Sequence, residues 1–95
     1  MLTKILGTAT NLTLSATAQT ITVTNTVQSG SLNVIKVRIA TSTQPAYVSF
    51  GTTATTSTSI LIPSNYCEHF KLDSTSTVSV LQAGTAGLIS ITPVA

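Results

Sequence analysis

Charged side chains are scarce in this sequence of 95 residues, of which only 6% are charged. They are Lys4, Lys36, Arg38, Glu68, Lys71 and Asp73. Ordinary soluble domains carry about 25% charged residues, and charge repulsion helps to keep their copies apart. The scarcity therefore favours a protein that packs against copies of itself or against partners. A monomer coated with Thr, Ser and Ala is the alternative.

The few charges also exclude two classes of function. The two acids, Glu68 and Asp73, lie at either end of one predicted strand, so one would have to fold back before both could act on the same bond. Lys36 and Arg38 are the only close pair of bases, whereas proteins that bind nucleic acids neutralise many phosphates with basic clusters. We expect neither paired-acid catalysis nor binding to DNA or RNA.

Cysteine occurs once, at Cys67, which excludes an internal disulfide. Cys67 and His69 would share one face of a strand, and a Cys–His pair can form a nucleophile. However, no glycine-rich turn beside them offers an oxyanion hole, and one Cys with one His is too few for a zinc site. We therefore expect no catalytic residue, no metal and no other cofactor. A cytoplasmic enzyme that uses Cys67 and His69 is the alternative.

Long apolar runs are also missing. No segment approaches the roughly 20 apolar residues that span a bilayer, and residues 1–7 lack the sustained apolar core of a signal peptide. We expect no membrane partner. Synthesis in a reducing cytoplasm is expected, followed by retention there or by release through another route, such as lysis.

Aromatic residues make up only 4% of the chain, and none is Trp. The alternation of apolar and polar residues places Phe50 and Phe70 in the core. Tyr47 and Tyr66 are then the candidates for a small exposed binding site. Packing at the edge of the core is the alternative role for both tyrosines.

Thr and Ser dominate instead, at about a third of the chain, and short stretches of alternating apolar and polar residues recur throughout. Alternation with a period of two, divided by turn residues at roughly 8–12-residue spacing, is typical of β-sandwiches and barrels. We predict an all-β fold, a compact antiparallel β-sandwich of about eight short strands, with a jelly roll as one candidate topology. The predicted strands are residues 11–15, 19–25, 32–40, 46–50, 59–62, 68–72, 78–82 and 87–92.

The longest predicted strand, residues 32–40, changes parity along its length. Leu32 and Val34 share one phase, whereas Ile35 and the apolar residues after it share the other. A bulge near Val34 and Ile35 would bring both groups to one face, because one extra residue re-aims everything that follows. Burial of the strand on both faces is the competing explanation.

Residues 1–9 precede the first regular alternation, and the sandwich domain is predicted to comprise residues 10–95. The amino-terminal segment contains the apolar residues Leu2, Ile5 and Leu6. They form either an arm that docks on a neighbour or an extra edge strand packed on its own sheet.

The chain from Val37 onward resembles small, Thr-rich structural proteins of tailed-bacteriophage virions. The matching pieces are a strand that ends in Phe50-Gly51, a Thr/Ala loop at 52–58, Leu61-Ile62-Pro63, Glu68-His69-Phe70-Lys71, and a closing segment at 87–91. Together they cover a little over half of the chain.

This resemblance implies a capsid decoration, or cement, protein that is made in the host cytoplasm and sits on the capsid surface of the virion. Such a protein is a dimer or trimer that binds and bridges major capsid protein subunits. The residues expected at its interfaces are Leu2, Ile5, Leu6, Thr52, Thr53, Thr55, Thr56 and Tyr66. The alternative is a receptor- or glycan-binding module of a phage tail or head fibre, with Tyr47 or Tyr66 in a groove.

Overall fold

The computed structural model describes residues 4–29, 32–72 and 75–95. In these ranges the chain forms nine strands and no helix, so no helix there is long and apolar enough to cross a membrane. The eight predicted strands are confirmed, and a ninth, β3, falls partly in residues 28–31, which had the residues of a turn. The strands are β1 (Thr10–Thr13), β2 (Gln19–Thr22), β3 (Val27–Ser29), β4 (Leu32–Thr41), β5 (Ala46–Phe50), β6 (Ile60–Ile62), β7 (Cys67–Leu72), β8 (Thr77–Gln82) and β9 (Leu88–Val94).

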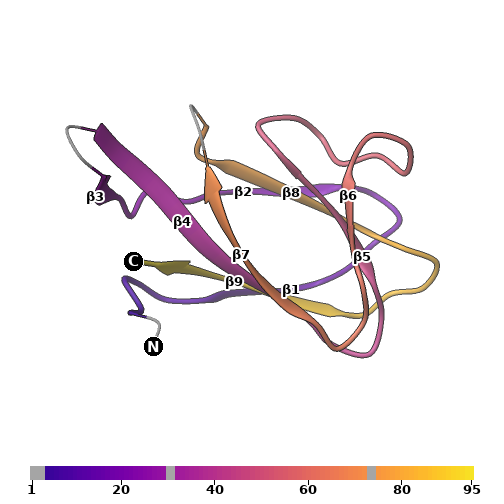
Figure 1. Ribbon diagram of the computed structural model, residues 1–95. Coiled ribbons are helices and arrows are strands. Elements are labelled where there is room, and N and C mark those ends of the chain that lie inside the picture. The colour runs from indigo at the N-terminus through magenta and orange to yellow at the C-terminus, as the bar shows by residue number, and fades with distance from the viewer. Residues whose placement is uncertain (1–3, 30–31, 73–74) are drawn as a thin grey trace.

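Two antiparallel sheets pack face to face. In the first sheet the order is β1-β9-β4, with both β3 and β7 paired to β4, and in the second it is β2-β8-β5-β6. The pairs are nested along the chain: the β5–β6 hairpin lies inside β4–β7, which lies inside β2–β8 and then β1–β9. This nesting, in which most connections cross between the sheets (Figure 1), defines a jelly roll. The predicted β-sandwich is thus confirmed.

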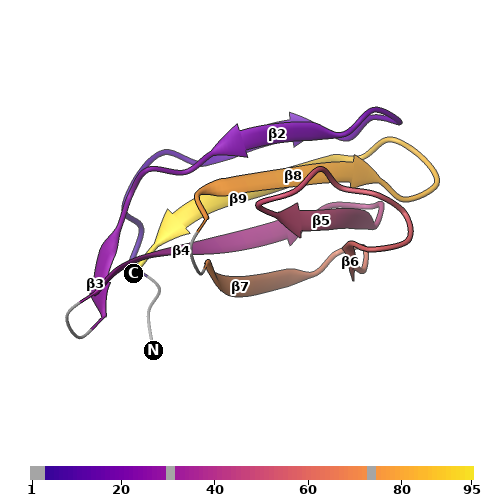
Figure 2. The ribbon, with the colours of Figure 1, turned by 90° about the horizontal axis from the view of Figure 1, so that it is seen from above.

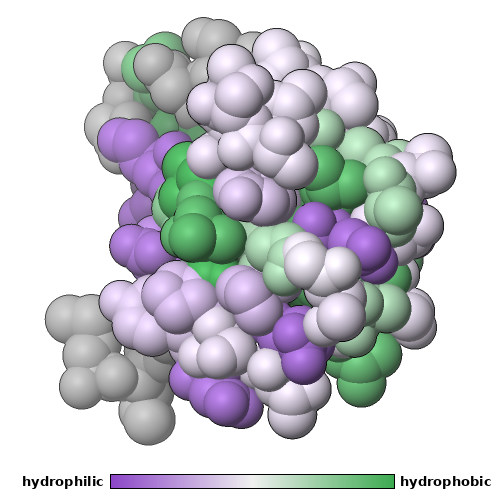
Figure 3. Space-filling model, turned by 90° about the vertical axis from the view of Figure 1, so that its right-hand side faces the viewer, coloured by the Kyte–Doolittle hydropathy of each residue, from purple (hydrophilic) through white to green (hydrophobic). Residues whose placement is uncertain are grey.

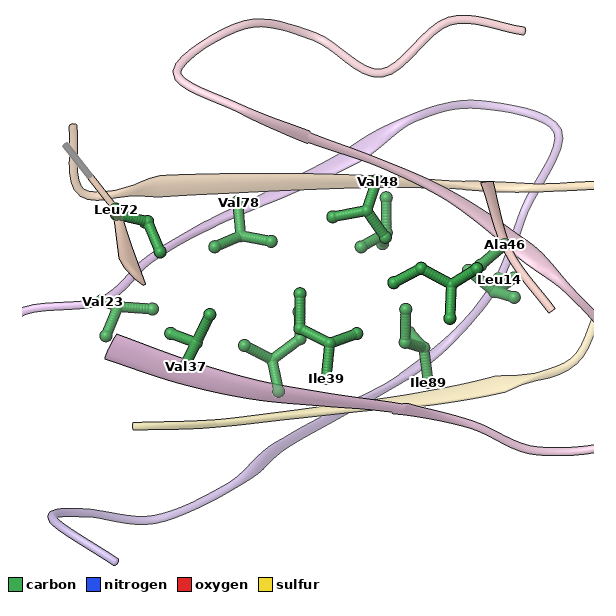
Figure 4. Packing of buried hydrophobic residues seen from close by; sticks show 12 residues of the cluster. Leu14, Val23, Val37, Ile39, Ala46, Val48, Leu72, Val78 and Ile89 are labelled. Carbon is green, nitrogen blue, oxygen red and sulfur yellow. The ribbon is translucent and has the colours of Figure 1, made fainter. Parts of the chain in front are cut away.

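The core lies between the sheets and is built from every second residue of the strands, because successive side chains of a strand point to opposite faces. Figure 4 shows Val37 and Ile39 of the first sheet facing Val78 and Val48 of the second. At the rim, the rings of Phe50 and Phe70 meet with their centroids 5.0 Å apart, in the inward positions predicted for them. The buried cluster consists of Leu14, Val23, Val37, Ile39, Ala46, Val48, Ile62, Leu72, Val78, Val80, Ile89 and Ile91.

Strand β4 is half-buried on both faces at Val34 and Ile35, as the second explanation of its change of parity expects, and alternates between buried and half-buried residues from Val37 onward. Val37 and Ile39 are completely buried, whereas Leu32, in the opposite phase, is 68% exposed. The register of β4 with β7 is unbroken from Ile35 to Ala40. Neither explanation anticipated the exposure of Leu32, which lies on the outer face of the sheet.

The loops at one end of the sandwich are tied to one another by backbone hydrogen bonds. The amide of Leu14 donates to the carbonyl of Gly87 over 2.7 Å, and the amide of Ser42 donates to that of Leu88 over 3.0 Å. Gly87 also lies so close to Gln44 that an added Cβ would be 2.7 Å from the Cβ of Gln44. A glycine is therefore required where these loops approach.

Replacing Ile39 by Ala should lower the free energy of unfolding by about 2–5 kcal/mol, because the substitution leaves a cavity at a fully buried position. The matched control is Leu32→Ala on the same strand, where the exposed side chain should contribute less than about 0.5 kcal/mol. Urea unfolding followed by circular dichroism measures both. Equal losses in the two variants would contradict the inward and outward faces assigned to β4.

Candidate functional site

The amino-terminal segment pairs with the end of β9. Ile5 forms a bridge with Val94, the amide of Leu6 donates to the carbonyl of Pro93 over 2.9 Å, and the amide of Ala95 donates to the carbonyl of Lys4 over 2.9 Å. Residues 4–6 therefore pack at the edge of their own sheet, as in the edge-strand alternative, and do not extend from it as an arm. Ile5 nevertheless keeps 57% of its side chain exposed, and Leu6 is half-buried. The third apolar residue of the segment, Leu2, lies outside the described residues.

The Thr-rich loop between β5 and β6 folds back over the outer face of the second sheet. Its Ala54 is buried, and the amide of Ala54 donates to the Oγ of Ser79 over 2.9 Å. The hydroxyls of Thr52 and Ser49 are 2.7 Å apart, and those of Thr55 and Thr58 are 2.6 Å apart. The loop is therefore held in one conformation by its own hydroxyls and by the sheet beneath it.

The side chains of Thr52, Thr53, Thr55 and Thr56 are all exposed along this loop. Thr53 and Thr56 make no side-chain hydrogen bond within the described part of the chain, whereas Thr52 and Thr55 use their hydroxyls inside the protein. Of the four predicted contact residues, Thr53 and Thr56 present the hydroxyls that are available to a neighbour.

Tyr66 lies in the turn between β6 and β7 and is 47% exposed. Its amide donates to the Oγ1 of Thr41 over 3.1 Å, and the Oγ1 of Thr41 donates to the carbonyl of Pro63, so β4 fixes this turn. Tyr47 lies on the outer face of β5 and is half-buried, in register with Leu61 and Leu81. The two tyrosines sit on separate elements, as candidates for separate contacts.

The predicted contact residues thus fall into three separate places. The amino-terminal segment and the β5–β6 loop lie at different ends of a molecule that measures 40 × 26 × 18 Å, in both Figure 1 and Figure 2. Tyr66 lies beyond the far end of β6 from the loop. The predicted contact residues are therefore spread over the surface and do not form one continuous patch.

Cys67 and His69 do share one face of β7, as predicted, and both side chains are exposed. They stand opposite Ala40 and Arg38 of β4. In the described ranges, no three His, Cys, Asp or Glu side chains are close enough to hold a metal ion. The register places Arg38 directly across from His69.

A shallow hollow of about 200 Å³ lies on the outer face of the first sheet. It is lined by Asn11, Ala40, Thr41, Ser42, Leu88, Ile89 and Ser90. Its lining includes neither Cys67 nor His69, and neither tyrosine. The hollow is mostly apolar, with Leu88 56% exposed beside it.

Basic residues meet on this same outer face, although Lys36 and Arg38 are the only close pair of bases along the sequence. The register places Lys36 of β4 directly opposite Lys71 of β7, and Arg38 directly opposite His69. Residues directly opposite on antiparallel strands project from the same face of the sheet, with Cβ atoms about 4.5–5.5 Å apart. We call these four residues the basic cluster. The i, i+2 spacing within each strand was visible in the sequence, but the pairing of β4 with β7 was not.

The surface elsewhere is dominated by hydroxyl-bearing residues. Figure 3 shows one end of the molecule largely covered by residues of near-neutral hydropathy, with separate apolar areas between them. Large apolar side chains that protrude from the described surface are Ile5, Leu32, Ile60, Leu61, Tyr66 and Leu88, each at least 45% exposed.

In comparisons with protein-family models, with curated proteins and with solved structures, no match to this chain was found.

Replacing Ser79 by Ala should lower the free energy of unfolding by about 1–3 kcal/mol, because the buried amide of Ala54 loses its acceptor. The matched control is Ser49→Ala, which removes a hydroxyl pair that is exposed to water and should cost less. Thermal unfolding gives the stabilities, and amide hydrogen exchange of residues 52–58 reports on the loop. Unchanged exchange at Ala54 in Ser79→Ala would contradict this anchoring role.

Replacing Lys71 by Glu should raise the free energy of unfolding by about 0.2–1 kcal/mol, because an opposed pair of like charges becomes an opposed pair of opposite charges. The control is Lys4→Glu, the same change of charge at a residue outside the two rows of the basic cluster, which should alter stability by less than about 0.5 kcal/mol. The difference should shrink in about 1 M salt, where charges are screened beyond about 3 Å. A loss of stability in Lys71→Glu at low salt would contradict the β4–β7 register.

Proposed function

We propose that this protein is a structural subunit of a virus particle, a decoration protein that covers the outside of a tailed-phage head and bridges its capsid subunits. It acts without a catalytic site, through the surface area that it adds between neighbours. The resemblance of residues 37–91 to phage virion proteins supports this class of function.

The observation that carries the proposal is the character of the surface. Large apolar side chains such as Ile5, Leu61 and Leu88 protrude from a surface with very few charges and many hydroxyls. Burying a hydroxyl that finds a hydrogen bond costs far less than burying a charge, and each buried large apolar side chain contributes about 1.5–3 kcal/mol. Such a surface is stabilised by neighbours.

The arrangement of the contacts also fits a bridging protein. Ile5 pairs with Val94 at the edge of the first sheet, whereas the Thr-rich loop is anchored on Ser79 of the second sheet, so we expect these two places to contact different subunits. In a closed symmetric shell every such contact is repeated, and weak contacts add up through multivalency. Jelly rolls are common in capsid proteins but also in lectins, so the fold by itself is compatible with this function and does not select it.

A test of the amino-terminal contact has to leave the backbone of this segment in place. Deleting residues 1–7 would also remove the hydrogen bonds to Pro93 and Ala95 and would uncover Val94, which is only 2% exposed. A substitution of Ile5 to Ser removes the exposed side chain and leaves these backbone bonds in place. It is therefore the cleaner variant.

Ile5→Ser should bind particles about ten- to a hundredfold more weakly than the unmodified chain, as expected for the loss of one buried aliphatic side chain. The measurement is re-addition of purified protein to particles that lack it, followed by electron cryomicroscopy of the shell. Circular dichroism controls for folding. The proposal predicts density for a β-sandwich on the outside of the head. Absence of the chain from particles, or turnover of a small molecule by a monomer, would overturn it.

A further inference from the structure

The basic cluster gathers charge that the rest of the molecule lacks. Three of the four Lys and Arg residues in the whole sequence, Lys36, Arg38 and Lys71, lie in two neighbouring rows on one face of the first sheet, with His69 as the fourth member. Neighbouring strands are about 4.8 Å apart, and successive residues on one face of a strand are about 6.6 Å apart. The Cα atoms of the four residues thus lie at the corners of a rectangle of roughly these dimensions.

No acidic residue in the described ranges offsets these charges. Glu68 is the one acid in the described ranges. It is paired with the inward-facing Ile39, so it does not share the face of β7 that carries His69 and Lys71. Lys36, Arg38 and Lys71 make no ion pair with it. Asp73 lies outside the described residues. Like charges directly opposite one another destabilise a sheet, so the Lys36–Lys71 pair is a feature that stability alone would disfavour.

We propose that the basic cluster docks a small group of carboxylates on a partner protein, and that the neighbouring hollow receives an apolar side chain of the same partner. Ala40 and Ser90, which line the hollow, follow Arg38 and Thr92 in the next row of the same face. An acidic segment that carries one apolar residue therefore matches both the charge and the shape of this face.

Carboxylates fit this face better than a nucleic acid does. Proteins that hold nucleic acid through its backbone commonly make about 6–10 phosphate contacts over an extended track. Here the charge is confined to two rows, and no aromatic ring projects from the cluster, because Phe70 of β7 packs against the core. Arg38 can bind a carboxylate through two parallel hydrogen bonds, with Lys36 and Lys71 beside it as point charges.

This inference rests on the proposed function in one respect: within a virus particle, this face would meet the acidic partner in or on the shell. The direct test needs only the purified full chain. A hexaglutamate peptide that ends in leucine is titrated into the protein at low salt, and two-dimensional amide NMR spectra are recorded. The neutral comparison is the same peptide with glutamines, and oligothymidylate represents nucleic acid.

The acidic peptide should shift the amide resonances of the basic cluster and of Leu88, and its binding should weaken as salt rises. Lys71→Gln should weaken it about two- to fivefold, and the double variant with Lys36→Gln should weaken it further. Lys4→Gln, the matched loss of one exposed lysine charge outside the two rows, should weaken binding less than Lys71→Gln does. Lys71→Glu should be folded and at least as stable as the unmodified chain, yet should bind the peptide least.

Equal weakening by Lys4→Gln and Lys71→Gln would overturn the assignment of the site, and tighter binding of oligothymidylate than of the peptide would overturn the assignment of the partner. The test also separates the two proposals. Loss of particle binding with intact peptide binding would count against the proposed function alone. Normal loading of Lys71→Glu onto particles, with no peptide bound by the unmodified chain, would count against this inference alone.

Discussion

The structure depends on one constraint: a strand presents alternate side chains to opposite faces, and here one face must close an apolar core that few other interactions support. The sequence supplies no disulfide and almost no charge, so burial between two sheets has to carry the stability. Val37 and Ile39 of one sheet and Val48, Val78 and Val80 of the other are all fully buried, and they hold the layers together. The outer faces, freed from this task, carry the hydroxyls, the basic residues and the exposed apolar side chains.

The nested pairing of the jelly roll then decides which outer residues become neighbours. Strand β4 follows β3 directly in the chain, but its partner β7 begins 26 residues after the end of β4, at Cys67, as the bounds Leu32–Thr41 and Cys67–Leu72 show. This pairing turns two modest i, i+2 pairs, Lys36 with Arg38 and His69 with Lys71, into one compact group. The basic cluster is therefore a product of topology, since no single stretch of sequence contains it.

That distinction explains what could be predicted from the sequence. Strand positions follow from local alternation, and all eight predicted strands occur, whereas β3 was missed because Ser29 and its neighbours have the composition of a turn. The inward positions of Phe50 and Phe70 follow from the same parity. Pairing between distant strands has no local signal, so the sequence did not predict that Lys36 and Arg38 would lie beside His69 and Lys71. The exposure of Leu32 was missed for a different reason: an apolar residue on an outer face has no sequence mark that separates it from a core residue.

The separation of charge from hydroxyls has a consequence for how such a domain would assemble. Charges act over distances of about a Debye length and orient an approaching partner, whereas hydroxyl and apolar surfaces contribute only after contact. A domain with charges spread evenly over its surface would pay a desolvation cost at every interface it forms. Confining Lys36, Arg38 and Lys71 to two neighbouring rows of the first sheet leaves the Thr-rich loop on the second sheet free to be buried cheaply. The one charged face can then set the orientation in which the uncharged faces meet their neighbours.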